Sequence, residues 1–537
     1  MARIFRWLVR IAGTMILAGA LAVTLIVWFA SRSLPDYDDT LEVAGLSAPL
    51  EIVRDNANIP HIFGETDADV FFGLGYAHAQ DRLWQMLMLR RTVNGKLSEL
   101  FGARTLPTDR LMRRLDLDGA AAASVRALDD ETRAALDAYS RGVNAWLAEV
   151  NAGARGRGAP EMWLFNHALS PWTPADSVAV VKLMALQLNA HIEDEVLRAR
   201  VSLLLEPERV ADIMPDAPGA GVAALPRFSS LIEEVPVDYA FARPEDDALF
   251  PVQRRGFGGA SNAWAAGITR SAAGATLLAN DPHLGLTAPS IWYLARLELS
   301  TGGVIGGTIP GVPLVLTGRS ADLGWGITAA YVDDTDINVE EVNPSNAGEY
   351  RTPDGWRPFR NQDSIVEVRD GVAETLRLQW TENGPVLSPD MFDLGTIRPP
   401  GHVTTISWTA LSREDTSVEA GLRLMRAASV AEAVEAMEGF VAPALNVVLA
   451  DRTRIGMKTV GHVPRRDPAH QSEGRIPTYG YLAENRWQGV MDYASNPAFM
   501  APAGGIVGNT NNKIVDQPFP EHLSFTWGDT QRINRWR

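Results

Sequence analysis

A glycine-rich segment leads directly into a serine near the middle of the chain. Residues 256–260 (GFGGA) precede Ser261, and a strand-like run begins at residue 262. Small residues allow the backbone to distort and another group to come close. Ser261 is therefore a candidate nucleophile, and the alternative is that this segment is only a flexible turn.

A second candidate site is acidic. Residues 333–336 read DDTD, and Glu340 and Glu341 follow closely. Crowded carboxylates repel one another unless a cation or several hydrogen-bond donors neutralise them. Hard oxygen ligands of this kind suit calcium. The alternative is an acidic turn that is solvated by water.

Other kinds of site are excluded by what the sequence lacks. It contains no H-E-x-x-H, Walker or G-x-S-x-G motif, and its nine histidines are scattered. With no cysteine, it has no disulfide, thiolate nucleophile, zinc–thiolate site or iron–sulfur cluster. The net charge of −16 argues against nucleic acid as a partner, because phosphate neutralisation needs a basic surface.

The N-terminus has the pattern of a membrane segment. Arg3, Arg6 and Arg10 precede the uncharged run Ile11–Ala30, and a spanning helix needs about 20 residues. We predict that residues 1–33 form an uncleaved anchor, with the body of the chain in the periplasm or outside the cell, because arginines stay in the cytoplasm. The alternative is secretion to the periplasm after cleavage of a signal peptide.

Candidate elements then follow along the chain. Thr66 and Asp69 form a capping box for a long helix that continues through Arg91. That helix is apolar on several faces and should be buried. Its charged residues Asp81 and Arg82 must then be paired with other groups.

The rest of the chain changes character near its middle. Helical periodicity covers 128–150 and 176–205, and the acidic, aperiodic stretch 226–255 indicates a linker or exposed loop. Strand-like runs follow at 262–268, 275–280, 303–308, 313–317, 323–329, 374–380, 403–409 and 446–461. Helices before a linker and strands after it predict an α+β fold.

Several motifs in this order resemble the penicillin acylase family of N-terminal-nucleophile (Ntn) hydrolases, from about residue 50 to the C-terminus. The motifs are IVRDNANIPHIFG, GLGYAHAQDRLWQMLMLRR, GKLSELFG, GASNAW, LLANDPHLGL, GTIPGVPLVLTGRSADLGWGITAAYVDDTDINVEEV, GNTNNK and FTWGDTQR. The segment 447–466 (VVLADRTRIGMKTVGHVPRR) departs from the family's usual hairpin.

The resemblance implies an αββα sandwich made from one precursor. A helix-rich α chain would cover 34–225, a spacer 226–260 and a strand-rich β chain 261–537. The two chains would form an α/β heterodimer. Family precursors continue past this point, so part of the C-terminal scaffold is expected to be missing.

The resemblance also implies the catalytic residues. Scission between Ala260 and Ser261 would free the α-amine of Ser261, whose pKa near 7.7 suits a general base. Four further positions match the family: the backbone N–H of Ala329 and the amide of Asn511 as oxyanion donors, and His283 and Arg532 beside the nucleophile's amine.

A structural calcium ion and an acyl pocket are implied in the same way. The calcium ligands would be Glu195, Asp333, the carbonyl of Thr335, Asp336 and Glu521. The pocket would contain Leu284, Thr317, Ile327 and Leu445. This mostly aliphatic set suits an apolar acyl chain.

The expected activity is hydrolysis of the amide between an apolar acyl group and an amine, through an acyl-enzyme on Ser261. The substrate would be a β-lactam side-chain amide, an N-acyl homoserine lactone or a lipoamino acid. Two alternatives from other classes are an anchored binding or scaffold protein without catalysis, and a metal-dependent amidase that uses the acidic cluster.

Overall fold

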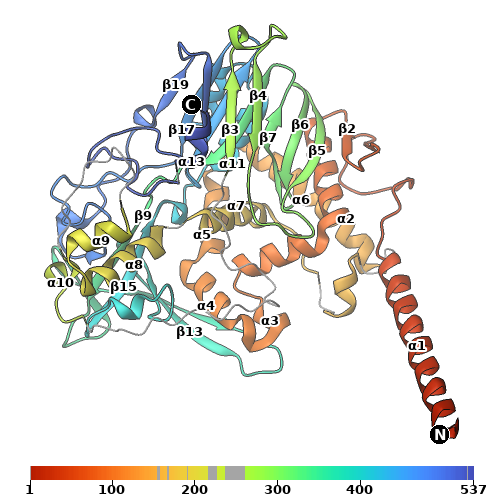
Figure 1. Ribbon diagram of the computed structural model, residues 1–537, viewed down its shortest axis with the longest axis horizontal. Coiled ribbons are helices and arrows are strands. Elements are labelled where there is room, and N and C mark those ends of the chain that lie inside the picture. The colour runs from red at the N-terminus through yellow and green to blue at the C-terminus, as the bar shows by residue number, and fades with distance from the viewer. Residues whose placement is uncertain are drawn as a thin grey trace.

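The protein has a helix-rich N-terminal part and a strand-rich C-terminal part (Figure 1). A computed structural model describes residues 2–153, 158–165, 169–189, 191–215, 227–235, 261–528 and 530–536. The helices of the first part are α1 (Ala2–Ser31), α2 (Asp67–Val93), α3 (Ser98–Phe101), α4 (Leu106–Leu115), α5 (Leu117–Ala127), α6 (Asp130–Asn151), α7 (Pro174–Leu188), α8 (His191–Leu204), α9 (Pro207–Ile213) and α10 (Phe228–Leu231). Three more follow later: α11 (Ser417–Arg426), α12 (Val430–Ala436) and α13 (Gln531–Trp536).

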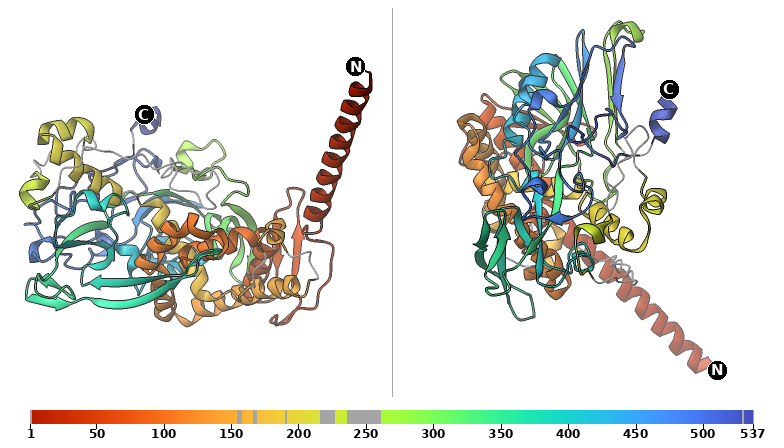
Figure 2. Two further views of the ribbon diagram at one scale, coloured as in Figure 1. Left: turned by 90° about the horizontal axis from the view of Figure 1, so that it is seen from below. Right: turned by 90° about the vertical axis from the view of Figure 1, so that its left-hand side faces the viewer.

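Helix α1 projects from the body as a single rod (Figure 2). It is long and apolar enough to cross a membrane, with a mean hydropathy of 2.2, and none of its residues is buried. An N-terminal helix of this composition is consistent with either an anchor or a signal peptide.

The predicted start of α2 is confirmed. Thr66 has extended backbone angles, and its Oγ1 accepts a hydrogen bond from the N–H of Asp69 at 3.1 Å. The pairing expected for the charged residues is also found. Asp81 accepts from Arg54 at 2.7 Å, and Arg82 donates to the carbonyl oxygen of Ser290 at 2.6 Å.

Helices α2 and α6 cross closely because each helix has a glycine that lies against the backbone of the other helix. A Cβ added to Gly75 would lie 2.1 Å from the carbonyl oxygen of Tyr139. One added to Gly142 would lie 1.9 Å from the carbonyl oxygen of Phe72. Both helices therefore fit against the large sheet as one layer.

The large sheet has nine strands in the order β1-β2-β5-β6-β7-β8-β16-β17-β19. They are β1 (Glu51–Arg54), β2 (Pro60–Phe63), β5 (Tyr293–Leu299), β6 (Gly302–Ile309), β7 (Val312–Arg319), β8 (Leu323–Ala329), β16 (Leu445–Asp451), β17 (Ile455–Val460) and β19 (Ala498–Met500). Neighbours are antiparallel except for β2 and β5. Helices α2, α7 and α11 contact this sheet.

A small sheet covers the same region from the other side. Its order is β20-β3-β4, with β3 (Asn262–Ala266) between β20 (Ile506–Asn509) and β4 (Leu277–Asp281). A compact core fills the space between the sheets and consists of Ala263, Ala265, Val448, Ala450, Ile455, Met457 and Val507. Helices, large sheet and small sheet form successive layers, which confirms the α+β class.

A further sheet extends from the side of this sandwich. It has the order β12-β13-β14-β15-β9-β18 and consists of β12 (Arg360–Val366), β13 (Glu374–Thr381), β14 (Gly384–Leu387), β15 (His402–Trp408), β9 (Thr335–Glu341) and β18 (Thr478–Tyr479). A separate hairpin pairs β10 (Glu349–Thr352) with β11 (Gly355–Pro358).

One sequence expectation was wrong, and a second falls mostly outside the described residues. The single helix expected over 176–205 is two helices, α7 and α8, because Asn189 is extended and its side chain donates to Asp334 and Thr335. The stretch 226–255 is not simply exposed. Phe228 of α10 is fully buried, and residues 236–255 lie outside the described part of the chain.

Candidate active site

Ser261 stands at the start of β3, the central strand of the small sheet, and is only 5% exposed. The small residues Ala263 and Ala265 let this strand pack closely on β8 and β16. The predicted nucleophile is thereby held beside the two inner strands β8 and β16 of the large sheet. Its expected cleavage partner, Ala260, lies outside the described residues.

Arg532 of α13 connects three residues around the nucleophile. Its Nη1 donates to the carbonyl oxygen of Ser261 at 2.7 Å and to Asn262 Oδ1 at 3.0 Å. Its Nη2 donates to Asn511 Oδ1 at 3.1 Å. The structure thus brings together Ser261, Asn511 and Arg532, which are far apart in the sequence.

The amide of Asn511 is fixed by both of its ends. Its Nδ2 donates to the carbonyl oxygen of Ala329 at 3.0 Å, and its Oδ1 accepts from Arg532 Nη2 at 3.1 Å. The backbone N–H of Asn511 also donates to Asn509 Oδ1 at 2.7 Å. The backbone of Asn511 is left-handed, with φ 63°. An amide carries two N–H bonds, so one bond to Ala329 leaves the second for a ligand.

The backbone N–H of Ala329 faces the same side of β8 as that of Ile327. The N–H of Ile327 donates to Asn280 Oδ1 at 3.1 Å, and N–H groups two residues apart on a strand point the same way. The next N–H along the strand, that of Ala330, donates to the carbonyl oxygen of Ala444 on the opposite side. The N–H of Ala329 therefore points away from Ala444, to the side of β8 on which Asn280 lies, and Ala329 lines the same pocket as Ser261.

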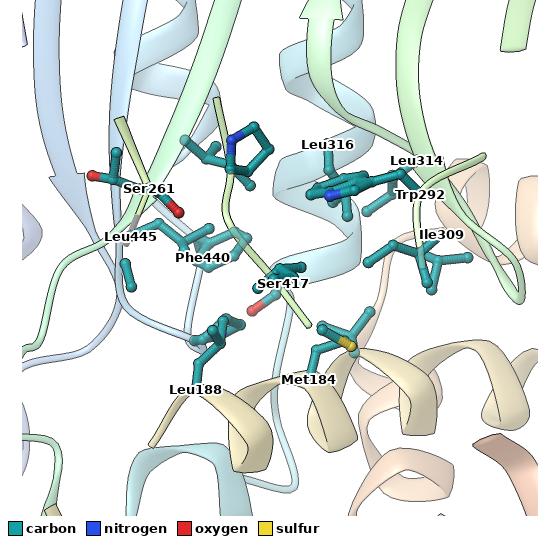
Figure 3. A pocket seen from close by; sticks show the side chains of 18 residues that line it. Met184, Leu188, Ser261, Trp292, Ile309, Leu314, Leu316, Ser417, Phe440 and Leu445 are labelled. Carbon is teal, nitrogen blue, oxygen red and sulfur yellow. The ribbon is translucent and has the colours of Figure 1, made fainter. Parts of the chain in front are cut away.

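An apolar pocket with a cavity volume of about 80 Å³ opens beside Ser261. Figure 3 shows Ser261 on one side, Trp292 and Ile309 on the other, and Met184 and Leu188 below on α7. The remaining lining residues are Val181, Pro282, Leu284, Val312, Leu314, Leu316, Ile327, Thr328, Ala329, Ser417, Phe440, Pro443 and Leu445.

Three of the four predicted pocket residues, Leu284, Ile327 and Leu445, line this pocket. Thr317 is not among the lining residues. Its Oγ1 donates to Asn280 Oδ1 at 2.7 Å, so it supports the amide that in turn holds β8. Thr317 is therefore placed behind the pocket wall.

His283 lies next to the pocket but is paired with another group. Its Nε2 is 2.6 Å from Asp281 Oδ2, and both side chains are partly exposed. Asn262 also donates to Asp281, at 3.4 Å. Among the described contacts, none joins His283 directly to Ser261.

Sequence reasoning missed several residues that shape the site. Asn280 fixes β8, and Trp292, Phe440 and Met184 supply pocket walls from three different elements. Asn280 lies inside the motif LLANDPHLGL, which was a usable signal. The three apolar residues resemble ordinary core residues, because no local pattern distinguishes a pocket wall from a packed interior.

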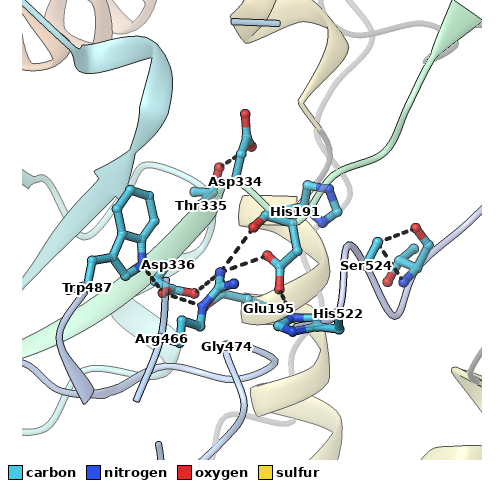
Figure 4. Close-up of polar contacts among 12 residues, drawn as sticks. His191, Glu195, Asp334, Thr335, Asp336, Arg466, Gly474, Trp487, His522 and Ser524 are labelled. Carbon is cyan, nitrogen blue, oxygen red and sulfur yellow. Dashed lines mark hydrogen bonds and ion pairs between the residues drawn. The ribbon is translucent and has the colours of Figure 1, made fainter. Parts of the chain in front are cut away.

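Four of the five predicted metal ligands gather at a separate, buried cluster between α8 and β9. Glu195 Oε2 accepts from the N–H of Ile337 at 3.1 Å, and Asp333 forms an ion pair with Arg466. Figure 4 shows Asp336 beside the guanidinium of Arg466. Thr335 is also buried, and its Oγ1 donates to Asp334. Glu521 is exposed, and no described hydrogen bond or ion pair joins it to the cluster.

Burial and charge set the ionisation of this cluster. Burial raises the pKa of Glu195 well above its ordinary value, and the charges of Asp336 and Asp333 add to that rise. Burial alone would raise the pKa of Asp333 too, but Arg466 and His522 lower it to about 2. Asp333 is therefore an anion in the folded protein.

Comparison with known proteins gives one consistent family. Residues 49–537 match the model described as Penicillin amidase. Penicillin acylase 2 proenzyme of Pseudomonas sp. (strain SE83) is 30% identical over 505 residues, covering 91% of this chain and 62% of that protein. Acyl-homoserine lactone acylase QuiP of Pseudomonas aeruginosa is 28% identical over 523 residues, covering 95% and 60%.

Among solved structures, a thermostable penicillin G acylase from Alcaligenes faecalis matches with a TM-score of 0.45 and 25% identity, over 51% of this chain and 49% of that one. The chain spans about three fifths of the length of these two curated relatives. Because the family match extends over residues 49–537, the chain belongs to the penicillin amidase family.

Proposed function

We propose that this protein is a self-cleaving N-terminal-serine amidohydrolase that acts on linear amides with an apolar acyl group. The observation that carries the proposal is the position of Ser261 at the edge of an apolar pocket, with Asn511 and the N–H of Ala329 nearby. A nucleophile, oxyanion donors and an acyl pocket are the parts that acyl transfer needs.

In the proposed reaction, Ser261 becomes the first residue of a new chain. Its freed α-amine removes the proton of its own hydroxyl, through a water molecule, while the oxygen attacks the amide carbon. The oxyanion then accepts hydrogen bonds from Ala329 and Asn511. The amine product leaves, and water hydrolyses the ester to release the acid.

Arg532 suits the role of holding this centre. Its guanidinium donates to the carbonyl oxygen of Ser261 and to Asn511, so it fixes the nucleophile and one oxyanion donor in the same geometry. A cation at this position also favours the unprotonated, basic form of a nearby amine. The role proposed for His283 beside the amine requires it to leave Asp281.

The pocket supports an apolar acyl group, and two substrate classes fit it. One is a β-lactam side-chain amide, in line with the relative named penicillin acylase 2 proenzyme. The other is an N-acyl homoserine lactone or lipoamino acid, in line with the relatives named acyl-homoserine lactone acylase QuiP. A panel of matched aryl-acetyl and long-chain acyl amides would separate the two classes.

For the location of the enzyme we propose a membrane anchor at α1 with the body outside the cytoplasm. The apolar, unburied α1 supports this arrangement. The mass of the N-terminal piece after expression in a bacterial host tests it. A mass that includes the N-terminus from residue 2 supports the anchor. A mass that shows the piece beginning near residue 33 would support a cleaved signal peptide instead.

Self-cleavage is the first test of the proposed function. We expect the full-length chain, purified in detergent, to give two pieces by intact mass under denaturing conditions, the second beginning at Ser261. The variant Ser261→Ala should give one uncut chain, while the matched control Ser300→Ala, at an exposed serine, should cleave like the parent.

An uncut parent would contradict the proposal for this chain and favour the non-catalytic scaffold alternative. Amide hydrolysis that survives Ser261→Ala but is lost with a chelator would instead favour a metal-dependent amidase.

A further inference from the structure

The carboxylates expected to bind calcium are already occupied by protein donors. Arg466 Nε and Nη2 donate to the two oxygens of Asp336, each at 2.9 Å. Arg466 Nη2 also lies 3.2 Å from Asp333 Oδ1 and donates to the Asp333 carbonyl at 3.2 Å. His522 Nε2 lies 3.3 Å from the other oxygen of Asp333. Trp487 Nε1 donates to Asp336 as well.

This arrangement does not fit a calcium ion. Calcium needs six to eight oxygen ligands. Here the carboxylate oxygens of Asp333 and Asp336 already form hydrogen bonds or ion pairs with protein groups. The fifth expected ligand, Glu521, is exposed, and its neighbour His522 faces Asp333 instead. No group of three or more acidic or histidine side chains placed to hold a metal ion occurs in the described part of the chain.

The surroundings of Arg466 are shaped to its guanidinium. Its side chain is 1% exposed, and the ring centroid of Trp487 lies 6.0 Å from Cζ. Gly474 passes directly over the group with φ 76°, and a Cβ there would lie 2.6 Å from Arg466 Nε. Any side chain at Gly474 would therefore displace the guanidinium.

The polar atoms left over in the cluster are complementary to each other. Arg466 Nη1 is a buried donor and Glu195 Oε1 is a buried acceptor, and neither has a partner among the described residues. A buried donor or acceptor without a protein partner is usually satisfied by an ordered water molecule. A metal ion would satisfy Glu195 alone and would repel Arg466.

We propose that Arg466, and not a calcium ion, neutralises the buried carboxylates of Asp333 and Asp336, beside which Glu195 of α8 accepts a hydrogen bond from the N–H of Ile337 in β9. Glu195 belongs to the predicted α chain, whereas Asp333, Asp336 and Arg466 belong to the predicted β chain. The tie between these parts would then not depend on a metal.

The test measures metal content and melting temperature on the full-length chain in detergent. We expect the parent, purified with calcium and then desalted, to retain substoichiometric calcium by elemental analysis, and to melt at the same temperature in EDTA and in calcium. One retained calcium per chain, together with a lower melting temperature in EDTA that calcium restores, would overturn the proposal.

The variant Arg466→Ser tests the arginine itself. Removing one partner of a buried ion pair is strongly destabilising, so its melting temperature should fall by about 5 °C or more, or the folded protein should be lost. Calcium should partly restore it, because the carboxylates become free. The matched control Arg465→Ser changes the exposed neighbouring arginine and should melt like the parent. Equal melting of both variants would refute the role of Arg466.

Discussion

At the scale of single residues, Ser261 and Asn511 are linked through one cation. Arg532 donates hydrogen bonds to both residues, and the side-chain amide of Asn511 also donates to the carbonyl oxygen of Ala329. An oxyanion donor is effective only if its direction is fixed before the reaction. Both ends of the Asn511 amide are fixed in this way.

The variant Asn511→Asp tests that donor. Aspartate tolerates the left-handed backbone and keeps an oxygen for Arg532, but it donates no hydrogen bond. We expect kcat per cleaved enzyme to fall by about 100- to 1,000-fold. Steady-state kinetics normalised to the cleaved fraction measure this, with Asn361→Ala on the distant strand β12 as the control. An unchanged kcat would exclude Asn511 as an oxyanion donor.

His78 supplies a pH-dependent term to stability. It is fully buried between Tyr139 and Thr308, at 2.8 and 2.9 Å, and burial lowers its pKa from 6.5 to about 3. Between these values the unfolded chain binds a proton that the folded chain does not. The free energy of unfolding should therefore fall as pH decreases from about 6.5 towards 3.

Urea unfolding of the parent and His78→Gln across this pH range measures the effect. Glutamine retains hydrogen bonding but takes up no proton, so its curve should fall less steeply, by up to about 1.4 kcal/mol per pH unit. His402→Gln, at a partly exposed histidine, should follow the parent. Parallel curves for the parent and His78→Gln would rule out this contribution.

At the scale of elements, the contact between α2 and α6 depends on the absence of a side chain. The variant Gly75→Ala places a Cβ 2.1 Å from the Tyr139 carbonyl, so the helices must move apart. Overpacking of this kind costs about 1–3 kcal/mol or more in the free energy of unfolding. Urea denaturation measures the loss, with Gly504→Ala as the control, since no atom lies within 4 Å of a Cβ there. Equal stabilities would contradict the close packing.

Elements also show where local pattern fails. The periodicity of 176–205 correctly predicts helix on both sides of residue 189, but it does not predict the interruption. Asn189 leaves the helix because its side chain binds Asp334 and Thr335, which are more than 140 residues away. Similarly, the alternative of a solvated acidic turn at residues 333–336 is wrong, because these residues are buried and β9, which begins at Thr335, pairs with β15.

At the scale of the whole molecule, buried ion pairs join the helical part to the strand-rich part. Lys182 of α7 donates to Asp415 at 2.8 Å and to the carbonyls of Ala410 and Ser412, and its side chain is 1% exposed. Losing one partner leaves an unpaired charge in a medium where water cannot solvate it.

The variant Lys182→Met therefore should lower the free energy of unfolding by about 3–5 kcal/mol. Chemical denaturation of the full chain measures it. The control Arg209→Met breaks the exposed pair with Asp212 and should change stability by less than about 0.5 kcal/mol. If both variants lowered the free energy of unfolding by the same small amount, Lys182 would not be holding the two parts together.

The sequence by itself determined the class of the fold, the family, the buried helix α2 and most strands. These follow from short-range signals: the capping pair at Thr66, alternation of apolar residues, and motifs with fixed spacing. It also singled out Ser261, Asn511 and Arg532, although the roles proposed for them remain predictions.

Only the tertiary structure decided what these residues contact. It placed Thr317 behind the pocket wall, paired His283 with Asp281, and put Arg466 among the predicted calcium ligands. Each outcome depends on side chains that come together from different segments of the chain, and on which hydrogen-bond donor lies nearest to a given acceptor. Periodicity and spacing describe neighbours along the chain, whereas hydrogen bonds and ion pairs act between neighbours in space.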